Sequence, residues 1–287
     1  MKNMMKKMLC GAAALCLMAS AAAAEFDAGK LIDVISREDG SGTRGAFVEL
    51  TGVEQKIDGK KVDMTTEDAQ ITNNTAVMMT TVAGDTYAIG YISLGSLNDS
   101  VKAVKVAGVE ATAENVKSGA YKVARPFNIA WQEAALSDAG KDFIAYILSS
   151  EGQEIVNANG YVGNSEAAAY EAAGVTGKVV VAGSSSVSPV MEKLAEAYMA
   201  ANTGVEIEFQ TSDSTPGMTS AMEGSCEIGM ASRELKDSET GAGAVSTAIC
   251  MDGIAVIVNN ANSLTGLTKD QIKGIYVGEV TEWSEVA

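Results

Sequence analysis

Residues 36–44 read SREDGSGTR, and they join a strand-like stretch at residues 31–35 to a helical pattern that begins at residue 45. Glycines let the backbone pass close to a ligand, and the first amides of a helix have no partner within the helix. Arg37 adds a planar cation that can bind two oxygens at once, and Ser41 and Thr43 add hydroxyl donors. The stretch therefore predicts an α/β unit whose turn forms half of a site for a tetrahedral anion.

A second stretch of the same design reads VVVAGSSSVSP at residues 179–189. Ser188 is at the position of an N-cap and Pro189 at the first helical position, where its missing N–H costs nothing. Apolar residues then recur at helical spacing as far as Met199. Either turn alone is more often an ordinary loop, but two of them, each between a strand and a helix, favour two halves of one anion site.

Several longer strings carry a resemblance to a known family: AGSSSVSPVMEKLAEAY, EIGMASRELK, MDGIAVIVN, LTKDQIKGIYVGEVTEW, VISREDGSGTRGAF and GDTYAIGYISLGSL. Over nearly the whole mature chain they resemble the phosphate-binding protein of the bacterial phosphate ABC transporter (PstS type). The resemblance implies an α/β, two-lobed periplasmic-binding-protein fold of type 2, with a hinge and an inter-lobe cleft. It also implies capture of inorganic phosphate between the lobes and its delivery to an ABC permease in the inner membrane, without cofactor, metal or covalent chemistry.

The order of the segments departs from the family pattern. The family carries AGSSS first and DGSGT second, whereas here WSEV ends the chain at residues 283–286 and its usual continuation, VISR, begins the mature protein. Each segment occurs once, so we interpret the chain as a circular permutation rather than a repeat. The Ala-rich stretch SEAAAYEAAG at residues 165–174 lies where the usual termini would be joined, so residues 165–177 are the expected permutation linker.

If the resemblance holds, the lobes follow from it. One lobe is expected to be built from both chain ends, residues 25–97 and 252–287, and the other to be continuous, residues 98–251. The hinge is then expected near residues 96–100 and 250–255, with the ligand between the lobes.

The resemblance also assigns ligand-binding residues. Two positions depart from the family: the loop at residues 210–217 has fewer glycines than usual, and Arg233 replaces an aspartate that usually accepts the ligand's proton. Asp39 matches an acid that pairs with the arginine of the site. The phosphate-binding residues expected are Arg37, Ser41, Gly42, Thr43, Ser185, Ser186, Ser214 and Ser232.

Asp252 is the candidate replacement for the missing aspartate, because it lies at an expected lobe crossing. A buried carboxylate accepts a hydrogen bond from protonated phosphate but repels sulfate. The alternative is a hinge carboxylate paired with Arg233 or Arg44, and the sequence leaves both open. It also leaves open another tetrahedral oxyanion as ligand: sulfate, molybdate or a phosphonate. Asn73 and Asn74 are expected to cap a helix rather than to contact the ligand.

Composition limits the remaining possibilities. Lys2, Lys6 and Lys7 precede a short apolar run and small residues, which predicts a cleavable signal peptide at residues 1–24 and a periplasmic protein. Neither Cys10 nor Cys16 follows a small residue, so no lipoprotein cleavage is expected. The net charge of −16 and a pI near 4.4 disfavour nucleic-acid binding. We expect a monomer.

An enzyme is disfavoured because the chain has no histidine, which excludes Ser–His catalysis. A secreted phosphate-ester hydrolase with Ser188 and Lys193 remains formally possible, although both residues lie on an ordinary amphipathic helix. After removal of the signal peptide only Cys226 and Cys250 remain. An oxidising compartment favours a disulfide between them, and two buried free thiols are the alternative.

Overall fold

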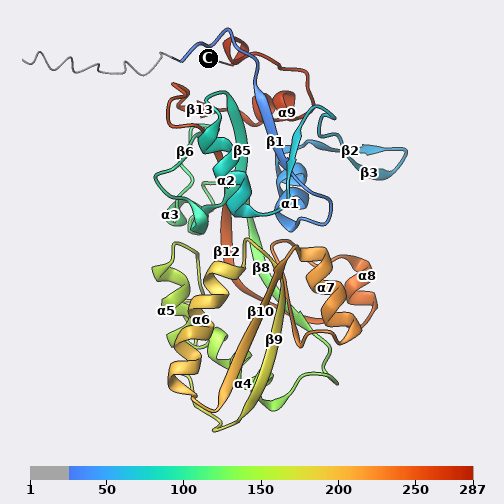
Figure 1. Cartoon of the computed structure of the whole chain (residues 1–287), viewed down its shortest axis with the longest axis vertical. Coiled ribbons are helices and arrows are strands. Elements are labelled where there is room, and N and C mark those ends of the chain that lie inside the picture. Colours follow the sequence, from blue (N-terminus) through green and yellow to red (C-terminus); the bar gives the residue numbers. More distant parts are fainter. Residues whose placement is uncertain (1–25, 287) are drawn as a thin grey trace, which may run out of the picture.

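The computed structural model describes residues 26–286, so the signal peptide expected at residues 1–24 lies outside the described part. The chain forms two α/β lobes, one above the other in Figure 1, joined by strands β8 (Ala124–Trp131) and β12 (Val245–Val258). β12 pairs with β8 through residues 245–253 and with β5 (Ala88–Ser93) through residues 254–258. One long strand therefore belongs to both lobes. None of the described helices is both long and apolar enough to cross a membrane.

A nine-stranded sheet runs through both lobes in the order β10-β9-β11-β8-β12-β5-β1-β4, with β6 also on β12. In the continuous lobe, the strands β10, β9 and β11 pair in parallel, and in the other lobe the strands β5, β1 and β4 do so. The two connecting strands, β8 and β12, pair antiparallel with each other and with their outer neighbours. In a parallel strand–turn–helix unit, the helix begins at the carboxyl end of the strand. Both Gly-Ser turns of the sequence lie at such ends.

The continuous lobe packs its helices around the hydrophobic residues of β9. Val179 and Val181 of β9 are buried in one cluster with Leu194 and Tyr198 of α6, as the helical spacing predicted. Besides β8 and part of β12, its elements are α4 (Asp138–Leu148), α5 (Ser150–Ala158), β9 (Gly177–Ser184), α6 (Ser188–Ala201), β10 (Val205–Ser212), α7 (Ser214–Glu223), β11 (Ile228–Ala231) and α8 (Asp237–Gly241).

The other lobe is built from both chain ends. Leu31 forms an antiparallel bridge with Glu282, and Ile32 N donates to Thr281 O at 2.8 Å, so the two ends lie side by side. Besides β5 and part of β12, its elements are β1 (Asp33–Arg37), α1 (Gly42–Thr51), β2 (Glu54–Ile57), β3 (Lys60–Asp63), β4 (Gln70–Thr72), α2 (Thr75–Gly84), η1 (Leu94–Ser96), β6 (Lys102–Ala103), β7 (Lys105–Val106), α3 (Ala113–Lys117), β13 (Gly266–Leu267), α9 (Lys269–Tyr276) and η2 (Trp283–Glu285).

The expected lobe boundary at residue 98 is wrong. Val104, Val116 and Tyr121 are buried in the same cluster as Phe47 and Trp283, which belong to the two chain ends. β6 pairs with the second half of β12 and β7 pairs with β13, so residues 101–123 complete the split lobe. The first crossing is at residues 123–125, where Ile254 N donates to Val123 O. The second crossing lies within residues 250–255, as expected.

The expected linker, residues 165–177, contains no helix or strand before β9 begins at Gly177. Asp142 of α4 accepts hydrogen bonds from Tyr170 Oη at 2.7 Å and from Ala173 N at 3.3 Å. These contacts hold the segment against the continuous lobe.

The predicted disulfide is absent, because Cys226 and Cys250 are both buried free thiols. Cys226 packs against Ala182 and Ala221, whereas Cys250 belongs to the main core of the continuous lobe. Burial raises the pKa of both thiols, which keeps them protonated and unreactive. The alternative reading of two buried thiols is therefore the one that the structure supports.

Candidate anion-binding site between the lobes

Four helices begin where the lobes meet: α1 and α2 from the split lobe, and α6 and α7 from the continuous lobe. Hydroxyl groups near their first residues contact one another. Thr43 Oγ1 in α1 lies 2.8 Å from Ser186 Oγ, just before α6, and Thr75 Oγ1 at the start of α2 lies 3.1 Å from the same atom. The first amides of a helix lack partners within it, and the helix dipole is positive there. Such an arrangement favours an anion.

Ser232, which follows β11, lies in the middle of this hydroxyl cluster. Its Oγ accepts from Ser184 Oγ at 2.9 Å, and its backbone N donates to Ser214 Oγ, at the start of α7, at 3.0 Å. Thr43 Oγ1 of the other lobe lies 3.4 Å from Ser232 Oγ. All of these side chains are buried. The structure thus brings together the predicted residues Thr43, Ser186, Ser214 and Ser232.

Gly42 lets the two lobes approach each other closely. A Cβ at this position would lie 2.2 Å from Ser214 Oγ and 2.8 Å from Ser232 Oγ, both of the opposite lobe. Any larger residue would therefore push the lobes apart. Ser41 precedes it as the N-cap of α1, and its Oγ accepts from Arg44 N at 3.3 Å. Ser41 thus orients the helix start at which Gly42 and Thr43 sit.

Arg37, at the end of β1, is the buried cation of the site, with only 2% of its side chain exposed. Its backbone N donates to Tyr91 Oη at 3.1 Å, and that hydroxyl also lies 2.9 Å from Ser36 Oγ. The ring of Tyr91 stacks on Phe47 of α1, with the centroids 4.0 Å apart. The aromatic core thus fixes the loop that carries Arg37, whose Nη2 reaches Ser185 Oγ across the boundary at 3.4 Å.

Two carboxylates contact the Arg37 guanidinium. Glu38 accepts from Nε at 2.8 Å and from Nη2 at 2.9 Å, and Asp213 of the opposite lobe accepts from Nη2 at 2.8 Å. The expectation that Asp39 pairs with this arginine is wrong. The Asp39 side chain is fully exposed and lies 3.2 Å from Arg44 Nη1 instead.

The other cations nearby do not face the hydroxyl cluster. Arg44 donates to Arg37 O at 2.8 Å and to Asp63 at 2.7 Å, so it ties the loop after β1 to β3. Arg233 forms a two-fold ion pair with Glu239, at 2.9 and 2.7 Å. The Arg233 side chain therefore does not take the place of the aspartate expected from the family.

Asp252 does not lie in the hydroxyl cluster. Its carboxylate accepts from Ser93 Oγ at 2.9 Å and from Arg125 Nη2 at 3.1 Å, where the strands cross between the lobes. Burial raises its pKa to about 6, and Arg125 opposes that rise. The geometry corrects the prediction that Asp252 reads the ligand's proton. It is a buried hinge carboxylate, and its partner is Arg125 rather than Arg233 or Arg44.

Four residues of the site were missed from the sequence: Glu38, Thr75, Ser184 and Asp213. Thr75 directly follows Asn74, which caps α2 as expected by accepting from Val77 N at 2.9 Å. A threonine directly after an expected N-cap places a hydroxyl group at a helix start, and this pattern could have identified Thr75 from the sequence. Nothing local in the sequence places Asp213 next to Arg37.

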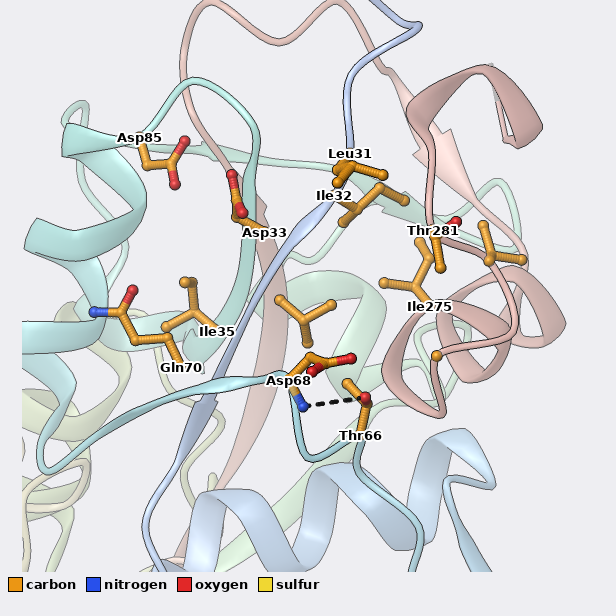
Figure 2. A pocket seen from close by; sticks show the side chains of 13 residues that line it. Leu31, Ile32, Asp33, Ile35, Thr66, Asp68, Gln70, Asp85, Ile275 and Thr281 are labelled. Carbon is orange, nitrogen blue, oxygen red and sulfur yellow. Dashed lines mark hydrogen bonds between the residues drawn. The ribbon is translucent and has the colours of Figure 1, made fainter.

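A separate pocket of about 430 Å³ lies beside β1, at the end of the split lobe where the chain ends meet. Figure 2 shows Asp33 and Asp85 turned toward each other on one side of it, with Asp68 on another. Burial and the charge of Asp85 raise the pKa of Asp33. No Lys or Arg lines this pocket. Three carboxyl groups without a cation exclude it as the oxyanion site.

Two α/β lobes that meet over hydroxyls, helix N-termini and a buried arginine define a two-lobed solute-binding protein. In agreement, the model of the PBP superfamily domain matches residues 18–151 and 168–287. Phosphate-binding protein PstS 2 of Streptococcus agalactiae is 54% identical over 257 residues, which cover 89% of this chain and 88% of that protein. The chain therefore belongs to the PstS-type family of phosphate-binding proteins of phosphate ABC transporters.

Two further comparisons agree with this assignment. Phosphate-binding protein PstS 2 of Streptococcus pneumoniae is 44% identical and covers 92% of this chain and 91% of that protein. The crystal structure of a phosphate-binding protein of a phosphate ABC transporter from the same species superposes with a TM-score of 0.71 at 44% identity. It covers 90% of this chain and 100% of that one.

Proposed function

We propose that this protein captures inorganic phosphate between its two lobes and delivers it to an ABC permease. The observation that carries the proposal is the buried Arg37 beside hydroxyls from four helix starts, two in each lobe. A tetrahedral anion offers oxygens in several directions, and donors from both lobes suit it better than donors from one. The relatives that match nearly the whole chain are named phosphate-binding proteins.

Within this proposal, the direct ligand contacts are Arg37 and Thr43 on one side and Ser185, Ser186, Ser214 and Ser232 on the other. Ser41 and Gly42 shape the helix start between them. Calorimetric titration with phosphate, sulfate, molybdate and a phosphonate tests the choice of ligand. We expect phosphate to bind most tightly, and tighter binding of another anion would replace phosphate as the substrate. Turnover of a chromogenic phosphate ester would instead favour a hydrolase.

We also propose that the segment order is circularly permuted relative to part of the family. Proteins named PstS from Staphylococcus saprophyticus and Bacillus subtilis match only 38% and 39% of this chain, as expected when one segment order cannot be aligned end to end with the other. The PstS 2 proteins of the streptococci match nearly from end to end and thus share the order found here. The adjacency of the chain ends, Leu31 beside Glu282, fits the proposal, because a permutation requires it.

Outside the site, we propose that residues 1–24 are removed on export and that the protein works outside the cytoplasmic membrane, in the periplasm where an outer membrane exists. We further propose that it is a monomer, since a single chain supplies both halves of the site. Light scattering with and without phosphate tests this. Binding by a dimer alone would point to exchange of the split lobe between two chains.

A further inference from the structure

Arg37 Nη2 has more acceptors than hydrogens. A guanidinium NH2 group carries two hydrogens, yet Nη2 lies within bonding distance of Glu38 Oε1 at 2.9 Å, Asp213 Oδ1 at 2.8 Å and Ser185 Oγ at 3.4 Å. Ser185 is the contact that leads to the hydroxyl cluster, so this nitrogen faces the place proposed for the anion. An anion that binds Nη2 must therefore displace one of the present acceptors.

Of the two carboxylates that bind Nη2, Asp213 is the one held by fewer hydrogen bonds. It occupies the N-cap position of α7, yet its side chain caps no amide. The third helical residue is Pro216, which has no N–H, and Thr215 N already donates to Gly40 O of the opposite lobe at 3.1 Å. In the described part of the chain, Arg37 is the only N–H donor to the Asp213 carboxylate. Glu38, by contrast, holds Arg37 through two nitrogens.

The two carboxyl groups are also close enough to share a proton. Burial and a hydrogen bond with Glu38 raise the pKa of Asp213 to about 7, and the charge of Arg37 opposes that rise. The other charged groups near this helix start are Arg233, Lys236 and Glu239. Arg233 and Lys236 donate to Thr215 Oγ1, and Glu239 neutralises Arg233.

We propose that the site binds its oxyanion together with one proton. The anion replaces Asp213 as a hydrogen-bond acceptor of Arg37 Nη2. The Asp213 carboxyl takes up a proton from solvent and shares it with the Glu38 carboxylate. This inference rests on the proposed function, because it concerns the same site. The Asp213 carboxylate gains one O–H bond to the proton that solvent supplies, no other covalent bond changes, and the charge of one proton enters with the anion. The positive charge of Arg37 lowers the pKa of Asp213. The bound anion neutralises that charge and thereby raises this pKa, so anion binding and protonation of Asp213 favour each other.

The sign of the pH dependence follows. Below pH 7 Asp213 is already protonated in the free protein, so its protonation adds no cost to binding. Above pH 7 each bound anion must bring in a proton, and the affinity falls by about tenfold per pH unit until the pKa of the complex is reached. At pH 8 the wild-type protein should therefore bind phosphate about tenfold more weakly than Asp213→Asn, and at pH 6 the two should bind alike.

The experiment is titration calorimetry of inorganic phosphate at pH 6 and pH 8, in buffers of different ionisation enthalpy, which counts the protons taken up. At pH 8 we expect close to one more proton per phosphate in the wild type than in Asp213→Asn. Asp39→Asn is the matched control, because it removes an equal charge from a carboxylate that does not contact Arg37. It should behave as the wild type, and Asp213→Ser serves as a second variant if Asp213→Asn folds poorly.

Two results would overturn the inference. Equal proton uptake in the wild type and in both Asp213 variants would remove the carboxyl from the binding reaction. Weaker phosphate binding in Asp213→Asn with stronger sulfate binding would mean that Asp213 accepts a proton from the ligand instead. Failure of the proposed function is distinguishable from both, because the wild type would then bind no phosphate at either pH.

Discussion

Replacement of Gly42 by alanine tests whether the site closes between the lobes. The added Cβ would lie 2.2 Å from Ser214 Oγ, 2.8 Å from Ser232 Oγ and 2.9 Å from Ser214 Cβ. Rotation of the hydroxyls cannot relieve the contact with Ser214 Cβ, so the opposite lobe must shift away. Overpacking of this kind costs about 1–3 kcal/mol. The three atoms nearest to the added Cβ all belong to the continuous lobe, so the substitution strains the contact between the lobes rather than the split lobe itself. The cost should therefore appear in ligand binding rather than in folding.

We expect Gly42→Ala to bind phosphate about 5- to 150-fold more weakly than the wild type, at 1.4 kcal/mol per factor of ten. Its melting temperature without ligand should be unchanged or slightly higher. Gly45→Ala is the matched control, since it is in the same helix and its added Cβ would have no atom within 4 Å. Calorimetry and thermal unfolding of the three proteins measure both effects. Normal binding by Gly42→Ala would refute the reasoning, and so would a large loss of stability relative to Gly45→Ala.

Three further predictions concern Arg37, Asp252 and the two cysteines. Arg37→Ala should weaken phosphate binding by more than any single serine change, by about 2–5 kcal/mol, because it removes a charged donor that can bind two oxygens; titration against Ser185→Ala measures this, and a smaller effect than that of Ser185→Ala would contradict it. Asp252→Asn should leave the ratio of the affinities for phosphate and sulfate unchanged. It should reduce the free energy of unfolding by about 3–5 kcal/mol, since Arg125 would remain buried without its counter-charge. A changed affinity ratio would mean that Asp252 takes part in ligand binding. Thiol counting in denaturant without reductant should find two free thiols, Cys226 and Cys250, whereas none would restore the disulfide.

Local patterns in the sequence predicted local structure well. The strand–turn–helix units at Arg37 and at Ser185 form as expected, because glycine and serine at fixed positions favour a turn after each strand. The predicted helix starts are wrong: α1 begins at Gly42 rather than at residue 45, because Ser41 caps it. The helix α6 begins at Ser188, so Val187 and not Ser188 is at the N-cap position, and Pro189 is the second helical residue. Asn74 caps a helix as expected, since capping involves residues three apart. The α2 helix begins at Thr75, directly after this cap, because residues 70–72 pair with β1 as a strand.

Contacts between distant segments were the part that the sequence did not reveal. The lobe boundary was missed because β6 and β7 are only two residues long, and their pairing with β12 and β13 depends on residues far away in the sequence. The pairing of Asp213 with Arg37 joins residues 176 positions apart, on opposite lobes. Asp252 lies at the crossing that was expected, but its partner Arg125 enters from a strand whose place depended on the wrong boundary.

A crystal structure of the protein with inorganic phosphate would show directly whether both lobes contact the ligand. We expect one phosphate within hydrogen-bonding distance of Arg37 and Thr43 from the split lobe, and of Ser186 and Ser214 from the continuous lobe. A phosphate that contacts only one lobe, or that lies in the acidic pocket beside β1, would contradict this expectation.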